Sequence, residues 1–259
     1  MRAFIRNEAK EAPGPEEGNR ILRPMQEGRP FQPAFEILRI GGRQLMMFLE
    51  ERIDLCEVAR MMFDRYLTNA AGGNITVKVS EELFLMTPTL MSQAKFCRLT
   101  PEDILVVDKH GNIYEGKGKL TREFNMHMAA YEALPEAGAV IHGHAKESMV
   151  FASLGMQMPN LTEATQKLGD IATLEFAPAT TKELAKIVRE HLLSRNGQLP
   201  VAALLNKHGV IVVDRTLRKA YDMFERLEYN AYVGIHAKIF SALGLYKEER
   251  KAYNYNLEE

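Results

Sequence analysis

Residues 139–145 read Ala-Val-Ile-His-Gly-His-Ala, an apolar run that ends in two histidines one residue apart. We expect a strand over 139–144, with His142 and His144 at its end. Side chains on a strand alternate between its two faces, so residues two apart point the same way. The two imidazoles can therefore converge on one ion, and Gly143 between them lets another group approach the backbone. The alternative is that the two histidines only end the strand and are exposed to solvent, without binding a metal.

On both sides of this run, the sequence alternates between strand and helix signals. Strands are expected at 75–79, 83–86, 104–107, 171–176, 201–205 and 210–213. Helices are expected at 123–134, 146–154, 181–194, 216–243 and in a run of about 20 residues with the apolar stripe Leu55, Val58, Ala59, Met62, Phe63 and Tyr66. Several strands are linked by hairpin signals such as His110-Gly111-Asn112. We therefore expect an α/β fold with a mainly antiparallel or mixed sheet and helices packed on it.

The composition is that of a globular protein. The chain has 259 residues, of which 46% are hydrophobic and 26% charged, and its net charge is −1. These values exclude a mainly disordered chain, a collagen-like repeat and a disulfide scaffold, and they give no overall attraction to nucleic acid or an anionic membrane. We expect a cytoplasmic protein, because the chain has only two cysteines and no leader in which basic residues precede an apolar run. We expect no membrane span, because no apolar run reaches about 18 residues.

Residues 1–35 differ from the rest of the chain. They hold five of the eleven prolines, namely Pro13, Pro15, Pro24, Pro30 and Pro33. We interpret this segment as an extended or partly disordered arm, which could equally wrap a neighbouring subunit. No linker divides the region that follows, so we expect one domain over 36–259.

A third candidate metal ligand is His208, in the turn Asn206-Lys207-His208-Gly209 where another apolar strand ends. His110 lies in a similar turn, but between polar residues of an expected exposed hairpin, so His208 is favoured. Three neutral imidazoles, with or without a carboxylate, suit a divalent transition metal, most often zinc. Three protein ligands also leave a position open for a substrate, as in a catalytic site.

Glu123 is the candidate acid, at the start of an expected helix. A glutamate there also favours the helix dipole and can cap the helix, so a structural role is an alternative. His127, four residues on along the same face, could be a metal ligand, a partner of a ligand or a packed histidine. The turn Gly72-Gly73-Asn74 could cradle a phosphate with its backbone N–H groups, or be a plain turn.

In chain order, five features resemble the class II aldolase/adducin family: Gly73-Asn74 before a strand, Thr87-Pro88-Thr89, Glu123 at a helix start, His142-x-His144, and His208-Gly209 before the last strand. The resemblance spans residues from about 70 to 230. It implies a three-layer α/β/α domain with a largely antiparallel central sheet, usually assembled as a homotetramer.

The resemblance also implies roles for individual residues. His142, His144 and His208 would bind Zn²⁺ or another divalent transition metal, and Glu123 would act as acid and base. A sugar-phosphate or related substrate would be bound by Gly73, Asn74, Thr89 and Thr121, with Arg122 as a bidentate donor where the family's aldolases commonly have serine.

Two positions depart from the family pattern, Leu90 and the pair Thr121-Arg122, which stands where the family's aldolases commonly have Ser-Ser, and one catalytic residue has no counterpart. Leu90 stands where the family's aldolases commonly have glycine after Thr-Pro-Thr. The family's catalytic tyrosine has no evident match in residues 160–163. Tyr253 or Tyr255 of the aromatic tail could replace it, from the same or a neighbouring subunit, or the tail could be a frayed terminus.

The expected function is that of a zinc-dependent aldolase, a carbon–carbon lyase of carbohydrate metabolism. It would cleave a ketose 1-phosphate to dihydroxyacetone phosphate and an aldehyde through a zinc-stabilised enediolate. Glutamate rather than aspartate at position 123 favours the aldolase over the epimerase branch. A decarboxylase, epimerase or dehydratase of the same family, acting on a sugar acid or pentulose phosphate, is the alternative. A non-catalytic, adducin-like assembly module is less favoured because all three histidines are present.

Overall fold

The computed structural model describes residues 39–40, 43–44 and 46–247, with side chains from residue 46 onward. The chain divides into two units, Met1–Leu45 and Met46–Glu259. In the first, the described residues form one antiparallel pair of two-residue strands, β1 (Arg39–Ile40) and β2 (Arg43–Gln44). The expected arm at 1–35 and the tail with Tyr253 and Tyr255 lie outside the described residues.

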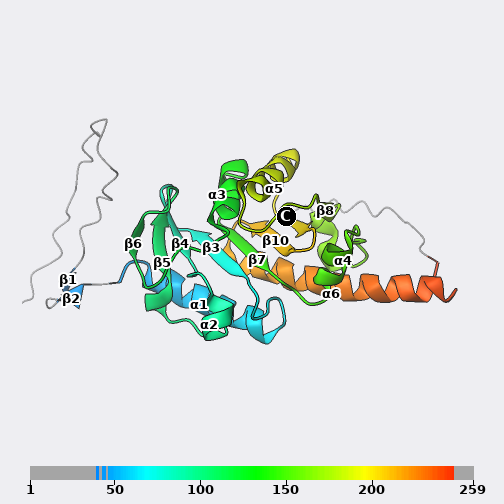
Figure 1. Cartoon of the computed structure of the whole chain (residues 1–259), viewed down its shortest axis with the longest axis horizontal. Helices are drawn as coiled ribbons and strands as arrows, with labels where there is room; N and C mark the ends of the chain where they lie inside the picture. Colours follow the sequence, from blue (N-terminus) through cyan, green and yellow to red (C-terminus); the bar gives the residue numbers. More distant parts are fainter. Residues whose placement is uncertain (1–38, 41–42, 45, 248–259) are drawn as a thin grey trace, which may run out of the picture. The chain divides into compact units, whose positions relative to one another are not determined.

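The second unit is built on an eight-stranded sheet (Figure 1), with the spatial order β6-β5-β4-β3-β7-β10-β9-β8. The strands are β3 (Asn74–Lys78), β4 (Leu83–Met86), β5 (Leu105–Asp108), β6 (Ile113–Glu115), β7 (Ala139–Gly143), β8 (Ala172–Leu174), β9 (Val201–Leu205) and β10 (Gly209–Asp214). Every neighbouring pair is antiparallel except β8 and β9, which are parallel. The largely antiparallel, mixed sheet that the sequence predicts is therefore confirmed.

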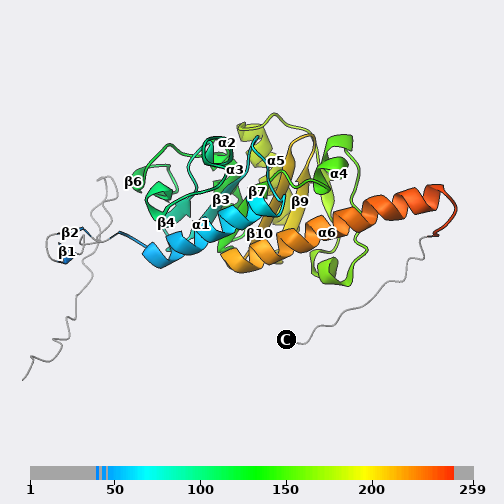
Figure 2. The ribbon, with the colours of Figure 1, turned by 90° about the horizontal axis from the view of Figure 1, so that it is seen from below.

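Helices cover both faces of this sheet (Figures 1 and 2). One face carries α1 (Leu49–Asp64), α2 (Met91–Lys95), α4 (Ser148–Leu154) and α6 (Leu217–Ala242), and the other carries α3 (Phe124–Ala133) and α5 (Lys182–Ser194). Two short 3₁₀ helices, Pro101–Asp103 and Glu163–Leu168, complete the unit. The architecture is thus the expected three-layer α/β/α arrangement.

Strand alternation divides the core into two apolar clusters, one on each face of the sheet. In β7, Ile141 packs with α1 and α6, whereas its neighbour Val140 packs with α3 and α5. In β10, Val212 and Val213 divide in the same way. Fully buried apolar strands of this kind need a helix layer on each face.

The ends of the helices show where local sequence signals hold. The Thr181 side chain caps α5 by accepting a hydrogen bond from the Leu184 N–H at 3.2 Å, as expected. Tyr66 does not belong to the apolar stripe of α1: it lies beyond the helix end, has a φ of 59° and is 69% exposed. The helix α2 has only five residues, too few to show a periodic pattern, and was not expected.

None of the helices among residues 46–247 has an apolar stretch long enough to cross a bilayer.

Arg52 is a charged side chain buried within the α1 layer. Its side chain is fully buried, and Nη1 donates to the carbonyl oxygens of Pro101 and Ile104, both at 2.9 Å. Its Nη2 lies 3.2 Å from Glu115 Oε1 at the end of β6. The guanidinium therefore ties α1 to the segment before β5 and to the edge strand β6.

We expect Arg52→Ala to lower the free energy of unfolding by about 3–5 kcal/mol, because it leaves the carbonyls of Pro101 and Ile104 without their donor and removes the cation that faces the partly buried Glu115 carboxylate. Urea unfolding followed by circular dichroism measures the loss. Arg60→Ala is the matched control, since Arg60 is on the same helix and forms a partly exposed ion pair with Asp64 at 2.7 Å. The control should cost less than about 1 kcal/mol. Equal losses in the two variants would show that the buried guanidinium does not stabilise the fold in this way.

Candidate active site

Three histidines lie together at one end of the central strands. His142 is on β7, His144 follows the strand, and His208 lies in the turn between β9 and β10. One ring nitrogen of each lies within 4.8 Å of the others. The ring centroids are 4.8–5.5 Å apart. The structure thus brings the three candidate ligands within reach of one cation, whereas His110 lies apart on the β5–β6 hairpin.

Hydrogen bonding orients the His142 ring. Its Nδ1 lies 2.9 Å from the carbonyl oxygen of Val210, so Nδ1 carries the proton and Nε2 keeps its lone pair. His144 Nε2 and His208 Nδ1 are buried without a hydrogen-bond partner among the described residues. Buried polar atoms without a partner are uncommon. Three imidazoles with lone pairs to share fit zinc or another divalent transition metal.

The surroundings keep these imidazoles neutral. Burial, and then the neighbouring His144 and His208, holds the pKa of His142 well below its ordinary value. Burial and His208 lower the pKa of His144 to about 4. Burial also lowers the pKa of His208. A neutral imidazole is the form that binds a metal ion.

Glycines give the rings their space. A Cβ at position 209 would lie 2.8 Å from His142 Cε1, 2.8 Å from His144 Cδ2 and 2.7 Å from the Gly143 carbonyl oxygen. A Cβ on Gly72 would clash with the His144 ring. A Cβ on Gly143 would clash with the Leu67 carbonyl oxygen, so the expectation of close approach at Gly143 is confirmed.

Glu123 lies beside the histidines, in the N-cap position of α3. Its Oε1 is 3.6 Å from His208 Nε2, and its carboxylate oxygens accept the Thr180 N–H at 3.1 and 3.3 Å. Burial raises the pKa of Glu123, and the Thr180 N–H opposes that effect. A buried carboxyl with a raised pKa next to candidate metal ligands suits proton transfer.

The candidate substrate-binding residues form a connected set. Asn74 is paired with His142 across β3 and β7. The next residue, Ile75, donates its N–H to Thr87 Oγ1 at 3.0 Å, which places the turn containing Thr89 beside the start of β3. Thr89 in turn donates its N–H to the Lys119 carbonyl at 2.9 Å.

Segment 119–123 continues from this turn to the start of α3. Thr121 is buried, and its Oγ1 accepts the N–H of Glu123 at 3.3 Å, whereas Arg122 is exposed. Gly73 has a φ of 105°, and the Thr68 and Ser92 hydroxyls each donate to the Gly72 carbonyl at 2.6 Å, which holds that turn. Thr89 and Thr121 are therefore hydrogen-bonded to the segment that carries Glu123, Asn74 lies beside His142, Gly73 follows the turn held by Thr68 and Ser92, and Arg122 is the exposed neighbour of Glu123.

One feature of the site was not found from the sequence, and the role of one residue was left open. The hydrogen bond from Thr180 to Glu123 uses a backbone N–H, which every residue except proline has, so the sequence cannot indicate it. His127, for which three roles were open, is not one of the clustered histidines but is packed against Asn74 and Thr76. Leu90 has a φ of 62° and is therefore in the left-handed conformation that favours glycine, the residue common in the family at this position.

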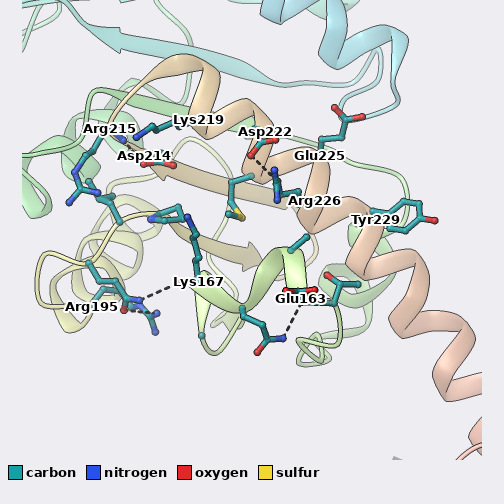
Figure 3. Close-up of a pocket in the computed structure, with 18 residues that line it drawn as sticks. Glu163, Lys167, Arg195, Asp214, Arg215, Lys219, Asp222, Glu225, Arg226 and Tyr229 are labelled. Atoms are coloured by element: carbon teal, nitrogen blue, oxygen red, sulfur yellow. Dashed lines mark hydrogen bonds and ion pairs between the residues drawn. The ribbon is translucent and has the colours of Figure 1, made fainter. Parts of the chain in front are cut away.

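A separate surface hollow lies at the other end of β10 (Figure 3). Asp214 at the end of β10, Arg215 directly after it and Lys219 in the first turn of α6 contribute to its wall. Side chains of both charge signs line it, and Arg226 pairs with Asp222 at 2.8 Å. None of the predicted site residues lines this hollow.

Comparisons with known proteins show the family and fold of this chain. Residues 53–235 match the family model described as Class II Aldolase and Adducin N-terminal domain. The L-fuculose phosphate aldolase of Methanococcus maripaludis is 32% identical over 183 residues, which are 70% of this chain and 93% of that protein. The 5-methylthioribulose-1-phosphate/5-deoxyribulose-1-phosphate aldolase of Rhodospirillum rubrum is 32% identical over 68% of this chain and 76% of that protein. A solved structure of L-fuculose 1-phosphate aldolase superposes with a TM-score of 0.67 at 28% identity, covering 75% of this chain and 89% of that one.

We expect Gly209→Ala to weaken zinc binding by about ten-fold or more, because the added methyl group displaces two of the three rings from their common point. Zinc bound per folded chain, measured by competition with a chromophoric chelator, tests this. Gly138→Ala is the matched control: its methyl group would clash with the Arg215 carbonyl oxygen, away from the histidines. Folded Gly209→Ala that binds zinc as tightly as the wild type would contradict the shared site.

Proposed function

Because this chain belongs to the class II aldolase and adducin family, we propose that it is a metal-dependent aldolase that cleaves a ketose 1-phosphate to dihydroxyacetone phosphate and an aldehyde. The observation that carries the proposal is the cluster of His142, His144 and His208 with the Glu123 carboxylate 3.6 Å from the His208 ring. The similarity to sugar-phosphate aldolases over about two thirds of the chain supports the substrate class.

His142, His144 and His208 would hold the cation, which we propose to be Zn²⁺ or another divalent transition metal. When bound, it supplies a Lewis acid that stabilises the negative charge developing on the enediolate as the carbon–carbon bond breaks. The hydrogen bond from His142 Nδ1 to the Val210 carbonyl keeps the other ring nitrogen available as a ligand.

Glu123 would move the proton. The carboxylate would take up the substrate's hydroxyl proton as the carbon–carbon bond breaks and the aldehyde forms, and the resulting carboxyl would then give this proton to the enediolate carbon; in the condensation direction both transfers would run in reverse. The raised pKa of the buried carboxyl favours uptake of a proton. Thr180, in the loop before α5, donates its N–H to the Glu123 carboxylate and so fixes the position of that carboxylate.

The substrate's phosphate would lie against Gly73, Asn74, Thr89 and Thr121, with the Arg122 guanidinium as a charged donor. Arg122 is exposed and directly precedes Glu123, so the same segment would supply a charged donor for the phosphate and the carboxyl that moves the proton.

We also propose a cytoplasmic homo-oligomer, by analogy with the tetramers of the family. Large apolar side chains near the end of α6 support contacts between copies: Ile239, Phe240 and Leu243 are 47%, 47% and 65% exposed.

Removal of the metal tests the role of the three histidines. We expect dialysis against a chelator to reduce cleavage of a ketose 1-phosphate by about a hundred-fold or more, and added Zn²⁺ to restore it. Cleavage is followed as dihydroxyacetone phosphate released from a panel of ketose 1-phosphates, with product identification to separate aldol cleavage from decarboxylation, epimerisation or dehydration. Full activity after verified metal removal would refute the proposal.

Substitution of the acid tests the proton transfer. We expect Glu123→Gln to keep its zinc content and to lower kcat by about 10²–10⁴-fold, because the amide cannot transfer the proton. Glu228→Gln is the matched control, since Glu228 is also a largely buried carboxyl with a raised pKa but bonds to Glu147 and Ser148 at the start of α4. Its kcat should stay within about two-fold of the wild type. If Glu123→Gln turned over normally, the base would have to be another group.

A further inference from the structure

A row of polar side chains is buried between α3 and β3. His127 of α3 is fully buried, and its Nε2 is hydrogen-bonded to Asn74 Oδ1. Its Nδ1 lies 2.8 Å from Thr76 Oγ1, which lies 3.0 Å from the hydroxyl of Tyr131. The chemistry proposed above uses Asn74 but assigns no role to His127, Thr76 or Tyr131.

The protons in this row can be placed by counting donors and acceptors. Burial lowers the pKa of His127 to about 3, so the ring is neutral near pH 7 and carries one N–H. Asn74 Oδ1 can only accept, so the proton is on Nε2. Nδ1 is then an acceptor, and the Thr76 hydroxyl donates to it. Since Thr76 has one hydroxyl proton, Tyr131 donates to Thr76 Oγ1.

This order of donors restricts the Asn74 amide. Its carbonyl oxygen is held by His127, and no hydrogen bond among residues 46–247 uses its side-chain nitrogen. Asn74 is 7% exposed and lies opposite His142 in the β3–β7 pairing. The group of Asn74 that remains available to a ligand next to the histidines is therefore its side-chain NH₂. This group donates hydrogen bonds and so suits an anionic oxygen.

We propose that His127 is a positioning residue that locks the Asn74 amide with its NH₂ group toward the substrate, so that Asn74 donates hydrogen bonds to an anionic phosphate oxygen. The inference rests on the proposed function, because it takes the ligand of Asn74 to be the substrate's phosphate. Without the Nε2–H donor, the amide is free to turn and present its carbonyl oxygen, which repels an anion.

The tautomer of His127 is tested without any substrate. In the full-length chain labelled with ¹⁵N-histidine, two-bond ¹H–¹⁵N correlation spectra at neutral pH should show His127 as the Nε2–H tautomer. Assignment comes from the signal that disappears in His127→Gln. A protonated Nδ1 or a doubly protonated ring would overturn the proposal whatever the enzyme's activity.

The effect on Asn74 is tested with inorganic phosphate as the probe. In His127→Leu, the Kd for phosphate should rise by about ten-fold, the loss expected for a hydrogen bond to a charged group, while the zinc content is unchanged. His127→Gln can offer an amide N–H near the place of Nε2, and its Kd should stay within about three-fold of the wild type. Tyr131→Phe, the control for disturbed packing, leaves the Thr76 hydroxyl free to donate to Nδ1 and should also bind phosphate normally.

The pairing of the two residues is tested by a double-mutant cycle. In an Asn74→Ala background, His127→Leu should weaken phosphate binding no further, because the amide that it positions is gone. Additive losses, or an unchanged Kd in His127→Leu alone, would overturn the role of His127 and leave the proposed aldolase standing. A wild-type chain that shows the expected tautomer but binds no phosphate would overturn both this role and the phosphate site of the proposed function.

Discussion

The candidate site depends on the antiparallel register of β7 between β3 and β10. Gly143 pairs with Val210 and His142 pairs with Asn74, so one strand end brings together two histidines, the turn with His208 and the candidate phosphate ligand. The Val210 carbonyl that accepts the His142 proton comes from the same pairing. A shift of one residue would move His142 to the opposite face of the sheet and separate the three rings.

The candidate active site also gathers several polar side chains within an otherwise apolar core. His142, His127 and Glu123 are all buried, and burial disfavours the charged form of each one. Backbone groups satisfy part of this set: the Val210 carbonyl holds one ring and the Thr180 N–H holds the carboxylate. His144 Nε2 and His208 Nδ1 have no hydrogen-bond partner within residues 46–247, which leaves both nitrogens available to a cation.

Local patterns in the sequence predicted the sheet and the histidine pair because both depend on near neighbours. Alternation along residues 139–144 and the glycines around them carry that information. Tertiary packing determines three features that neighbouring residues in the sequence do not indicate. These are the short length of α2, the exposed position of Tyr66 and the contact between His127 and Asn74. The same holds for Thr180, which acts through its backbone. The grouping of His142, His144 and His208 is now seen in three dimensions, whereas the roles of the phosphate-binding residues and of Glu123 stay predictions.

The two outer strands of the eight-stranded sheet, β6 and β8, have three residues each. So short a strand offers a second chain few backbone groups with which to pair, and short edges are one way in which proteins avoid joining edge to edge. Growth of the sheet from one molecule into the next is thereby disfavoured. Any ordered assembly of this chain through the second unit would be built from side-chain contacts on its helices and loops, whose geometry point substitutions can change without disturbing the strands that hold the histidines.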